Sequence, residues 1–127
     1  KGIFMKINSR IILIAALGLF SSNIMATQLP SDIYHPASAE ILKAQPFENG
    51  EFVAEFKVNA EHISIRELAA RVIADAREKG FSVEQSMVKR DNADIKFYRD
   101  NQELKVSLEL KSPRAIEYKA ALDLNKN

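Results

Sequence analysis

The stretch ISIRELAARVIADAREKGF, Ile63–Phe81, has the clearest local pattern in the chain. Ser64 and Glu67 have the spacing of a capping box, in which each side chain accepts a hydrogen bond from a free backbone N–H at the start of a helix. Gly80 stands where a residue in the left-handed conformation commonly ends a helix. The apolar residues return every three or four positions and predict one buried stripe on an amphipathic helix. They are Ile65, Leu68, Ala69, Val72, Ile73 and Ala76.

The polar side of this helix carries two pairs of opposite charge, Glu67/Arg71 and Asp75/Lys79. Each pair is spaced by four residues, so its two side chains lie one turn apart. We expect both to form exposed ion pairs that stabilise the helix by a few tenths of a kcal/mol each.

Stretches on both sides of the helix alternate apolar and polar residues, the pattern of a strand with one buried face. They are EFVAEFKV (51–58), DIKFYR (94–99), LKVSLELK (104–111) and IEYKAALDL (116–124). The segment FSVEQSMVKR (81–90) predicts a further strand, but its inward face is ambiguous. Such alternation is typical of antiparallel sheets with one face in water. We therefore expect an α+β fold, a two-layer sandwich with one helix packed on a five-stranded, mostly antiparallel sheet in the order β-α-β-β-β-β.

The alternation also predicts the core. Strand residues that face the helix should be buried together with the apolar stripe of the helix. The expected core is Phe52, Phe56, Leu68, Val72, Ile95, Phe97, Val106, Leu108, Tyr118 and Leu122.

The segment RIILIAALGLFSSNIMA, Arg10–Ala26, is uncharged after its first residue. A basic start, an apolar run too short to span a bilayer and a small residue at the end are typical of a secretory signal peptide. We expect a leader over residues 1–26, with the signal peptide at Met5–Ala26, and a periplasmic or secreted protein with no stable membrane anchor after cleavage. A buried helix and an uncleaved anchor are the weaker alternatives.

Residues 27–50 contain three of the four prolines and predict an irregular N-terminal arm ahead of a single domain at 51–127. Within the arm, ASAEILKA (37–44) suggests two helical turns that are stable only when docked on something else.

Composition excludes several classes of function. The chain has no cysteine, so thiol catalysis, zinc–thiolate sites and disulfides are absent. Three of the 18 Lys and Arg residues precede Ala26 whereas all 17 Asp and Glu residues follow it, so residues 27–127 are slightly acidic. This balance argues against a nucleic-acid partner. We expect no cofactor.

Two similar segments, RDNADIKF (90–97) and RDNQELKV (99–106), raise the question of a cation site, because Asp and Asn oxygens suit calcium. Successive turns of a meander lie at opposite ends of a strand, roughly 20 Å apart, so the two segments cannot form one site. We interpret them as turns and expect no metal site.

The two histidines, His35 and His62, are the only residues that suggest catalysis. A small periplasmic hydrolase or metal-dependent enzyme would need one of them in contact with an Asp or Glu inside a pocket. No catalytic motif surrounds either residue, so this remains the alternative interpretation.

The favoured function is that of a small exported, non-catalytic binding or accessory protein of the inhibitor, immunity or stress type, with another protein as partner. Strand addition at a sheet edge is one docking route, and the first strand, with Phe52 and Val53, is the candidate edge if it lies outermost. The open sheet face offers Tyr98 as an aromatic anchor flanked by Lys96 and Lys105, although a solvated face of cross-strand ion pairs is the favoured interpretation of this surface. Tyr34 and His35 are candidate contacts in the arm.

Overall fold

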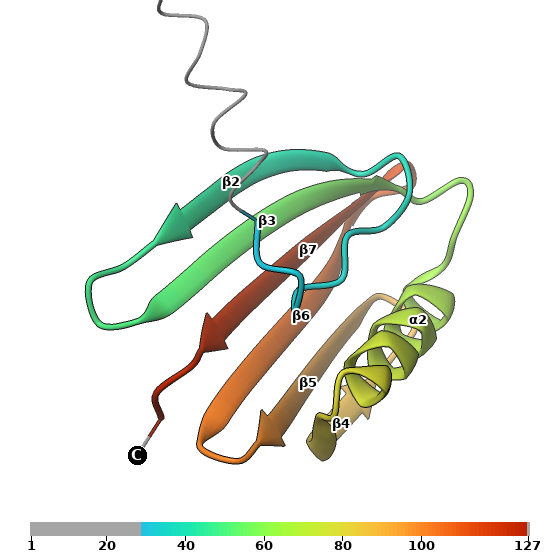
Figure 1. Cartoon of the computed structure of the whole chain (residues 1–127). Helices are drawn as coiled ribbons and strands as arrows, with labels where there is room; N and C mark the ends of the chain where they lie inside the picture. Colours follow the sequence, from blue (N-terminus) through green and yellow to red (C-terminus); the bar gives the residue numbers. More distant parts are fainter. Residues whose placement is uncertain (1–28, 127) are drawn as a thin grey trace, which may run out of the picture.

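The computed structural model describes residues 29–126 and has one helix on one antiparallel sheet (Figure 1). Helix α2 spans Ile65–Glu78. The strands are β2 (Glu40–Pro46), β3 (Glu51–Asn59), β4 (Ser82–Val88), β5 (Asn92–Arg99), β6 (Gln102–Ser112) and β7 (Ala115–Asp123). They form a single sheet in the order β2-β3-β7-β6-β5-β4. The α+β class with one helix on one sheet is confirmed, and the predicted signal peptide lies outside the described residues.

The sheet has six strands rather than five, because part of the expected arm is the strand β2. The expectation of helical turns at 37–44 is wrong. After a turn in which the Ala39 N–H donates to the Pro36 carbonyl (3.2 Å), the chain pairs antiparallel with β3. Ile41 and Ala44 then lie opposite Phe56 and Ala54, so strand pairing buries their side chains as two isolated helical turns would not.

The sheet order places the first predicted strand, β3, inside the sheet between β2 and β7. Phe52 and Val53 are therefore not at an edge, so the condition under which the first strand was the candidate docking edge is not met. The helical connection from β3 leads to β4 at the far side of the sheet, so the two strands are not neighbours. The edges are β2 and β4, and the last strand of the chain, β7, lies in the interior.

Helix α2 begins as the sequence predicts. The Glu67 N–H donates to Ser64 Oγ (3.1 Å), and the Ser64 N–H donates to Glu67 Oε1 (3.3 Å). The helix packs against β4, β5 and β6.

All ten residues of the predicted core are buried. The Asp–Asn segments lie at turns, and Asp100 adopts the left-handed conformation (φ 55°) that such residues tolerate.

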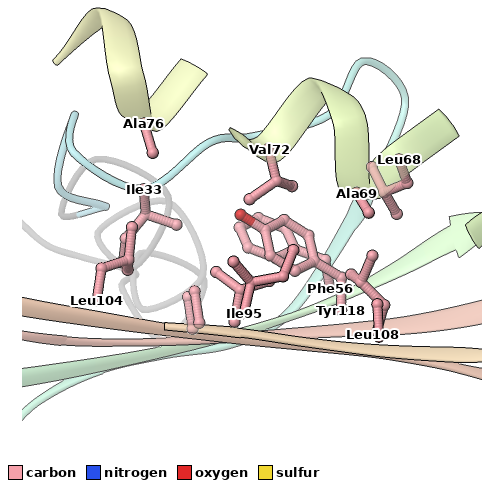
Figure 2. Close-up of a cluster of buried hydrophobic side chains, with 14 of the residues drawn as sticks. Ile33, Phe56, Leu68, Ala69, Val72, Ala76, Ile95, Leu104, Leu108 and Tyr118 are labelled. Carbon is pink, nitrogen blue, oxygen red and sulfur yellow. The ribbon is translucent and has the colours of Figure 1, made fainter. Parts of the chain in front are cut away.

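Residues 29–39 form a second cover on the same face of the sheet, beside the helix and over β3 and β7 (Figure 1). Ile33 inserts into the core with 3% of its surface exposed, between Ala76 of the helix and Leu104 of the sheet (Figure 2). The Tyr118 hydroxyl donates to the Tyr34 carbonyl (2.7 Å), and the Tyr118 ring stacks on Phe56. The segment expected to be peripheral therefore completes the core.

Arg99 of β5 attaches this segment to the helix end. Its guanidinium donates to both carboxylate oxygens of Asp32 (3.2 Å each) and to the Lys79 carbonyl at the C-terminus of α2 (2.7 Å). The Lys79 ammonium in turn donates to the Ser31 carbonyl. These bonds hold residues 29–39 against the helix and so set one wall of the cleft described below.

Candidate functional site

A cleft of about 370 Å³ opens where residues 29–39, the end of β3 and the first turns of α2 meet. We call it the N-terminal cleft. Its polar lining comprises Tyr34, Ser38, His62 and Arg71, with Asn59 at the strand end. Its apolar lining is Pro36, Val58 and Ile63, next to Ala37.

Arg71 has no ion-pair partner among residues 29–126, although Glu67 stands one turn before it. The predicted pair is not formed because the Glu67 carboxylate accepts from the Ser64 N–H in the capping box. The second predicted pair is present, with 2.7 Å between Lys79 Nζ and Asp75 Oδ2. The cap of the helix therefore leaves the guanidinium of Arg71 available to the cleft.

The two histidines lie in different surroundings. His62 lines the N-terminal cleft together with Arg71, whereas the exposed His35 ring lies over Phe56, with 5.2 Å between ring centroids. None of the described residues that line the cleft is Asp or Glu. The structure thus brings a histidine together with a cation and not with the carboxylate that the alternative, catalytic interpretation requires.

Metal ligands do not gather in the described part of the chain. No group of three or more His, Asp or Glu side chains within residues 29–126 has the geometry to hold a metal ion.

Ser38, on the rim of the cleft, adopts a positive φ of 64°. It is the third residue of the turn from Pro36 to Ala39, closed by the hydrogen bond between these two residues. A positive φ at this position of a turn favours glycine, since a Cβ atom makes the conformation unfavourable. The turn therefore holds a serine hydroxyl at the cleft at a cost in backbone energy.

The open face of the sheet carries three of the predicted site residues, Tyr98, Lys96 and Lys105. Tyr98 is 48% exposed. Lys96 and Lys105 lie directly opposite each other on β5 and β6, and both line a hollow of about 260 Å³ with Gln85 and Met87 of β4. Two like charges in register repel each other, and the carboxylate of Asp94, which lines the same hollow, offsets part of this repulsion.

A glutamate already compensates part of this charge. Glu103 Oε2 lies 3.9 Å from Lys96 Nζ, and Glu103 Oε1 lies 3.8 Å from Lys105 Nζ and 3.4 Å from Lys126 Nζ. One carboxylate faces three ammonium groups, but Asp94 lines the same hollow and Asp123 is in register with Glu103, so the charges on this part of the face are close to balanced.

Of the remaining predicted residues, only Val53 shares this face, because it is in register with Ala121 and through it with Lys105. Phe52 is buried in the core and Val53 is half-buried in an interior strand. Tyr34 and His35 lie on the opposite face, in residues 29–39. The sequence-based prediction thus combined residues from two separate surfaces, and it missed Ser38 and Arg71 of the cleft.

The two edges of the sheet differ in character. The edge strand β2 carries Glu40, Lys43 and Pro46, and charge and proline both discourage pairing with another strand. In β4, the run Gln85–Val88 has neither charge nor proline, and Met87 is 46% exposed. No strand of the described chain pairs with the outer side of β4.

The weak alternation of β4 in the sequence is the signal that could have identified this edge. Only Val83 and Val88 are half-buried, and the rest of the strand is exposed. A strand that is covered poorly on both faces is typical of the margin of a sheet.

Within residues 29–126, the fold and these surfaces define a small α+β protein with a polar cleft beside the helix and an uncharged, unpaired run on the β4 edge of the sheet. No protein-family model matches the sequence, and no curated protein is significantly similar to it. Among residues 29–126, no helix combines the length and the apolar character needed to cross a membrane.

Proposed function

We propose that this protein is a small exported, non-catalytic binding protein that acts by contact with another protein, as inhibitors, immunity proteins and stress accessory proteins do. The observation that carries the proposal is the unpaired, uncharged run Gln85–Val88 on the outer edge of β4. Its unpaired backbone N–H and C=O groups are a template for an extended segment of a partner, whereas Glu84 and the break in register between Val83 and Gln85 discourage pairing at the start of the strand.

Side chains next to this edge indicate what kind of segment fits. A strand added to β4 would bring its side chains beside Met87 on the open face, next to the hollow that Lys96 and Lys105 line. Backbone hydrogen bonds supply affinity in this mode of binding, and the side-chain hollows supply selectivity. A partner strand with an apolar residue beside Met87 matches this part of the edge, whereas Asp94, directly opposite Met87, disfavours an acidic residue there.

Export supports the same class of function through the sequence. The segment Arg10–Ala26 has the plan of a signal peptide. We expect a mature protein that begins near Thr27 in the periplasm or the medium. Intact-mass spectrometry of the fractionated protein tests this, and a cytosolic protein that retains Met5 contradicts it.

The docking test compares the two edges with matched variants. Met87→Lys places a charge on the β4 edge, and Leu42→Lys does the same on β2, where Leu42 is 48% exposed. Each tagged variant is used to capture partners from a periplasmic extract, with quantitative mass spectrometry as the readout and circular dichroism as a check of folding. We expect Met87→Lys to lose a partner that Leu42→Lys retains.

Hydrogen exchange on the captured complex gives a second readout. A docked strand should slow amide exchange in Gln85–Val88 and leave β2 unchanged. Equal capture by both variants, or protection of β2 alone, contradicts docking at β4.

A further inference from the structure

The N-terminal cleft is a second surface, on the opposite face of the sheet from Tyr98 and formed by different elements from the β4 edge. Its polar side chains are mainly hydrogen-bond donors: the Arg71 guanidinium, the His62 ring, and the hydroxyls of Tyr34 and Ser38. The side-chain oxygen of Asn59 is already occupied, because it accepts from the Glu61 N–H (2.8 Å). A cleft with many donors, one permanent cation and no carboxylate in its described lining requires an anionic, acceptor-rich ligand.

Arg71 specifies the type of anion. A guanidinium offers a planar fork of N–H groups, which matches the two oxygens of a carboxylate. In the capping box, Glu67 is directed to the helix start, so no internal carboxylate competes for this fork within residues 29–126. The capping-box hydrogen bond to Glu67 thus leaves the Arg71 guanidinium free to bind a ligand.

The cleft also has an apolar part, formed by Pro36, Val58 and Ile63. A volume of about 370 Å³ lies within the range of small-molecule sites, roughly 300–1,000 Å³. This apolar part and the volume suit a ligand whose carboxylate is attached to a short aliphatic body.

The backbone conformation of Ser38 independently indicates that the rim of the cleft has a role in ligand binding. Glycine would adopt the φ of 64° without a steric cost, yet the position holds a serine, which lines the cleft. Unfavourable backbone conformations of this kind concentrate at ligand sites, where the side chain is needed in that place.

We propose that the N-terminal cleft binds a small aliphatic carboxylate, with Arg71 as the partner of the carboxylate group, Ser38 and His62 as further donors, and Pro36, Val58 and Ile63 against the aliphatic body. Two sources share this chemistry: a free carboxylic acid and the C-terminal carboxylate of a peptide that ends in an aliphatic residue.

The test is a titration of the full folded chain, monitored by amide NMR shifts, with defined probes. The probes are 4-methylpentanoate, its uncharged amide, the peptide Gly-Gly-Leu and inorganic phosphate. We expect both carboxylate probes to shift the amides of Ser38, His62 and Arg71, and the amide probe to bind at least tenfold more weakly. The carboxylate that binds more tightly, 4-methylpentanoate or the peptide, identifies whether the ligand is a free acid or a peptide C-terminus. An amide or a phosphate that binds as well as the carboxylates overturns the proposal.

Two variants assign the contacts. Arg71→Gln should weaken binding of 4-methylpentanoate at least tenfold, whereas Arg66→Gln, on the same helix but outside the cleft lining, should leave it unchanged. Ser38→Gly should weaken binding while the melting temperature stays the same or rises, because glycine suits the backbone. Equal binding by Arg71→Gln and the wild type overturns the proposal. The β4 variants should bind these probes normally, so this test is independent of the docking test.

Discussion

Arg99 shows how one side chain can stabilise the fold by joining segments that are far apart in the sequence. Its guanidinium pairs with Asp32 and binds the Lys79 carbonyl, and it lies 4.1 Å from the centroid of the Phe81 ring. Gly80 allows this arrangement, because a Cβ at its φ of 92° would lie 3.3 Å from Arg99 Cδ. The side chains of Arg99 and Asp32 are 23% and 25% exposed, so solvent screens the pair only in part.

The contribution of Arg99 can be measured with Arg99→Met, which retains the aliphatic stem and removes every donor. We expect a loss of about 1–3 kcal/mol of stability in urea unfolding, because the helix-end carbonyl and Asp32 lose a charged partner. Combined with Asp32→Asn in a double-mutant cycle, the variant should show coupling.

Lys111→Met is the control for this cycle. Its ammonium pairs with exposed Glu109 and with Glu117, and such surface pairs contribute about 0–1 kcal/mol. A control as destabilising as Arg99→Met would show that removal of any cation has this effect.

Tyr118 links stability to pH. Burial raises the pKa of its phenol, and the charge of Asp75 acts in the same direction. In the unfolded chain this phenol ionises near pH 10. Its contribution to stability is therefore complete below that pH and is lost as the pH rises further, by up to about 1.4 kcal/mol per pH unit.

Tyr118→Phe tests this linkage. At pH 7 the variant should be less stable by about 0.5–1.5 kcal/mol, since the Tyr34 carbonyl loses its donor. Between pH 10 and 11 the difference should shrink, because phenylalanine does not ionise. Urea unfolding at several pH values measures both effects, and a difference independent of pH contradicts the assignment.

At the scale of elements, two different kinds of segment cover the same face of the sheet. Helix α2 covers β4–β6 with a regular apolar stripe, whereas residues 29–39 cover β3 and β7 through Ile33 and Pro36, both buried. The irregular segment uses hydrogen bonds to other elements in place of its own regular backbone pairing. Removing it would expose the core, so residues 29–50 cannot be treated as a dispensable arm.

Ile33→Ala measures the contribution of this second cover. We expect a loss of about 2–5 kcal/mol, as for a buried aliphatic side chain of a core. Ser31→Ala, whose side chain is exposed, should change stability by less than about 0.5 kcal/mol. Denaturant unfolding measures the stability of both variants. Equal stabilities would show that residues 29–39 are not part of the core.

At the scale of the whole molecule, the order of strands differs from the order of the sequence. The last strand, β7, pairs with β3 on one side and β6 on the other along most of its length. Consequently, β3 and β6 become parts of one sheet only when the C-terminal strand β7 pairs with both. Pairing over such long sequence separations is expected to make folding slower than in helical proteins.

Deletion of residues 113–127 tests this dependence. The shortened chain should lack the cooperative unfolding transition of the wild type, because β3 and β6 lose their shared neighbour and the core loses Tyr118 and Leu122. A synthetic peptide of residues 113–127 should restore the circular dichroism spectrum when added in excess. A stable, cooperative fragment without the peptide contradicts the central role of β7.

Patterns within single segments were sufficient to predict the helix, its cap and the buried faces of β3, β5, β6 and β7, whereas the weak alternation of β4 left its buried face open. The reason is that periodicity and capping are local properties, set by residues at most four positions apart. The core residues followed from the same patterns, because the apolar face of a strand or helix is buried against the other elements of the fold.

Tertiary structure alone decided the sixth strand, the sheet order and the cleft. Ile41 and Ala44 become part of a strand only because β3 offers a partner with Phe56 and Ala54 opposite them. The N-terminal cleft combines Ser38 and Arg71, which are 33 positions apart in the numbering, and depends on a capping contact that frees the arginine. Such features arise from contacts between distant segments, and local periodicity carries no information about which segments will meet.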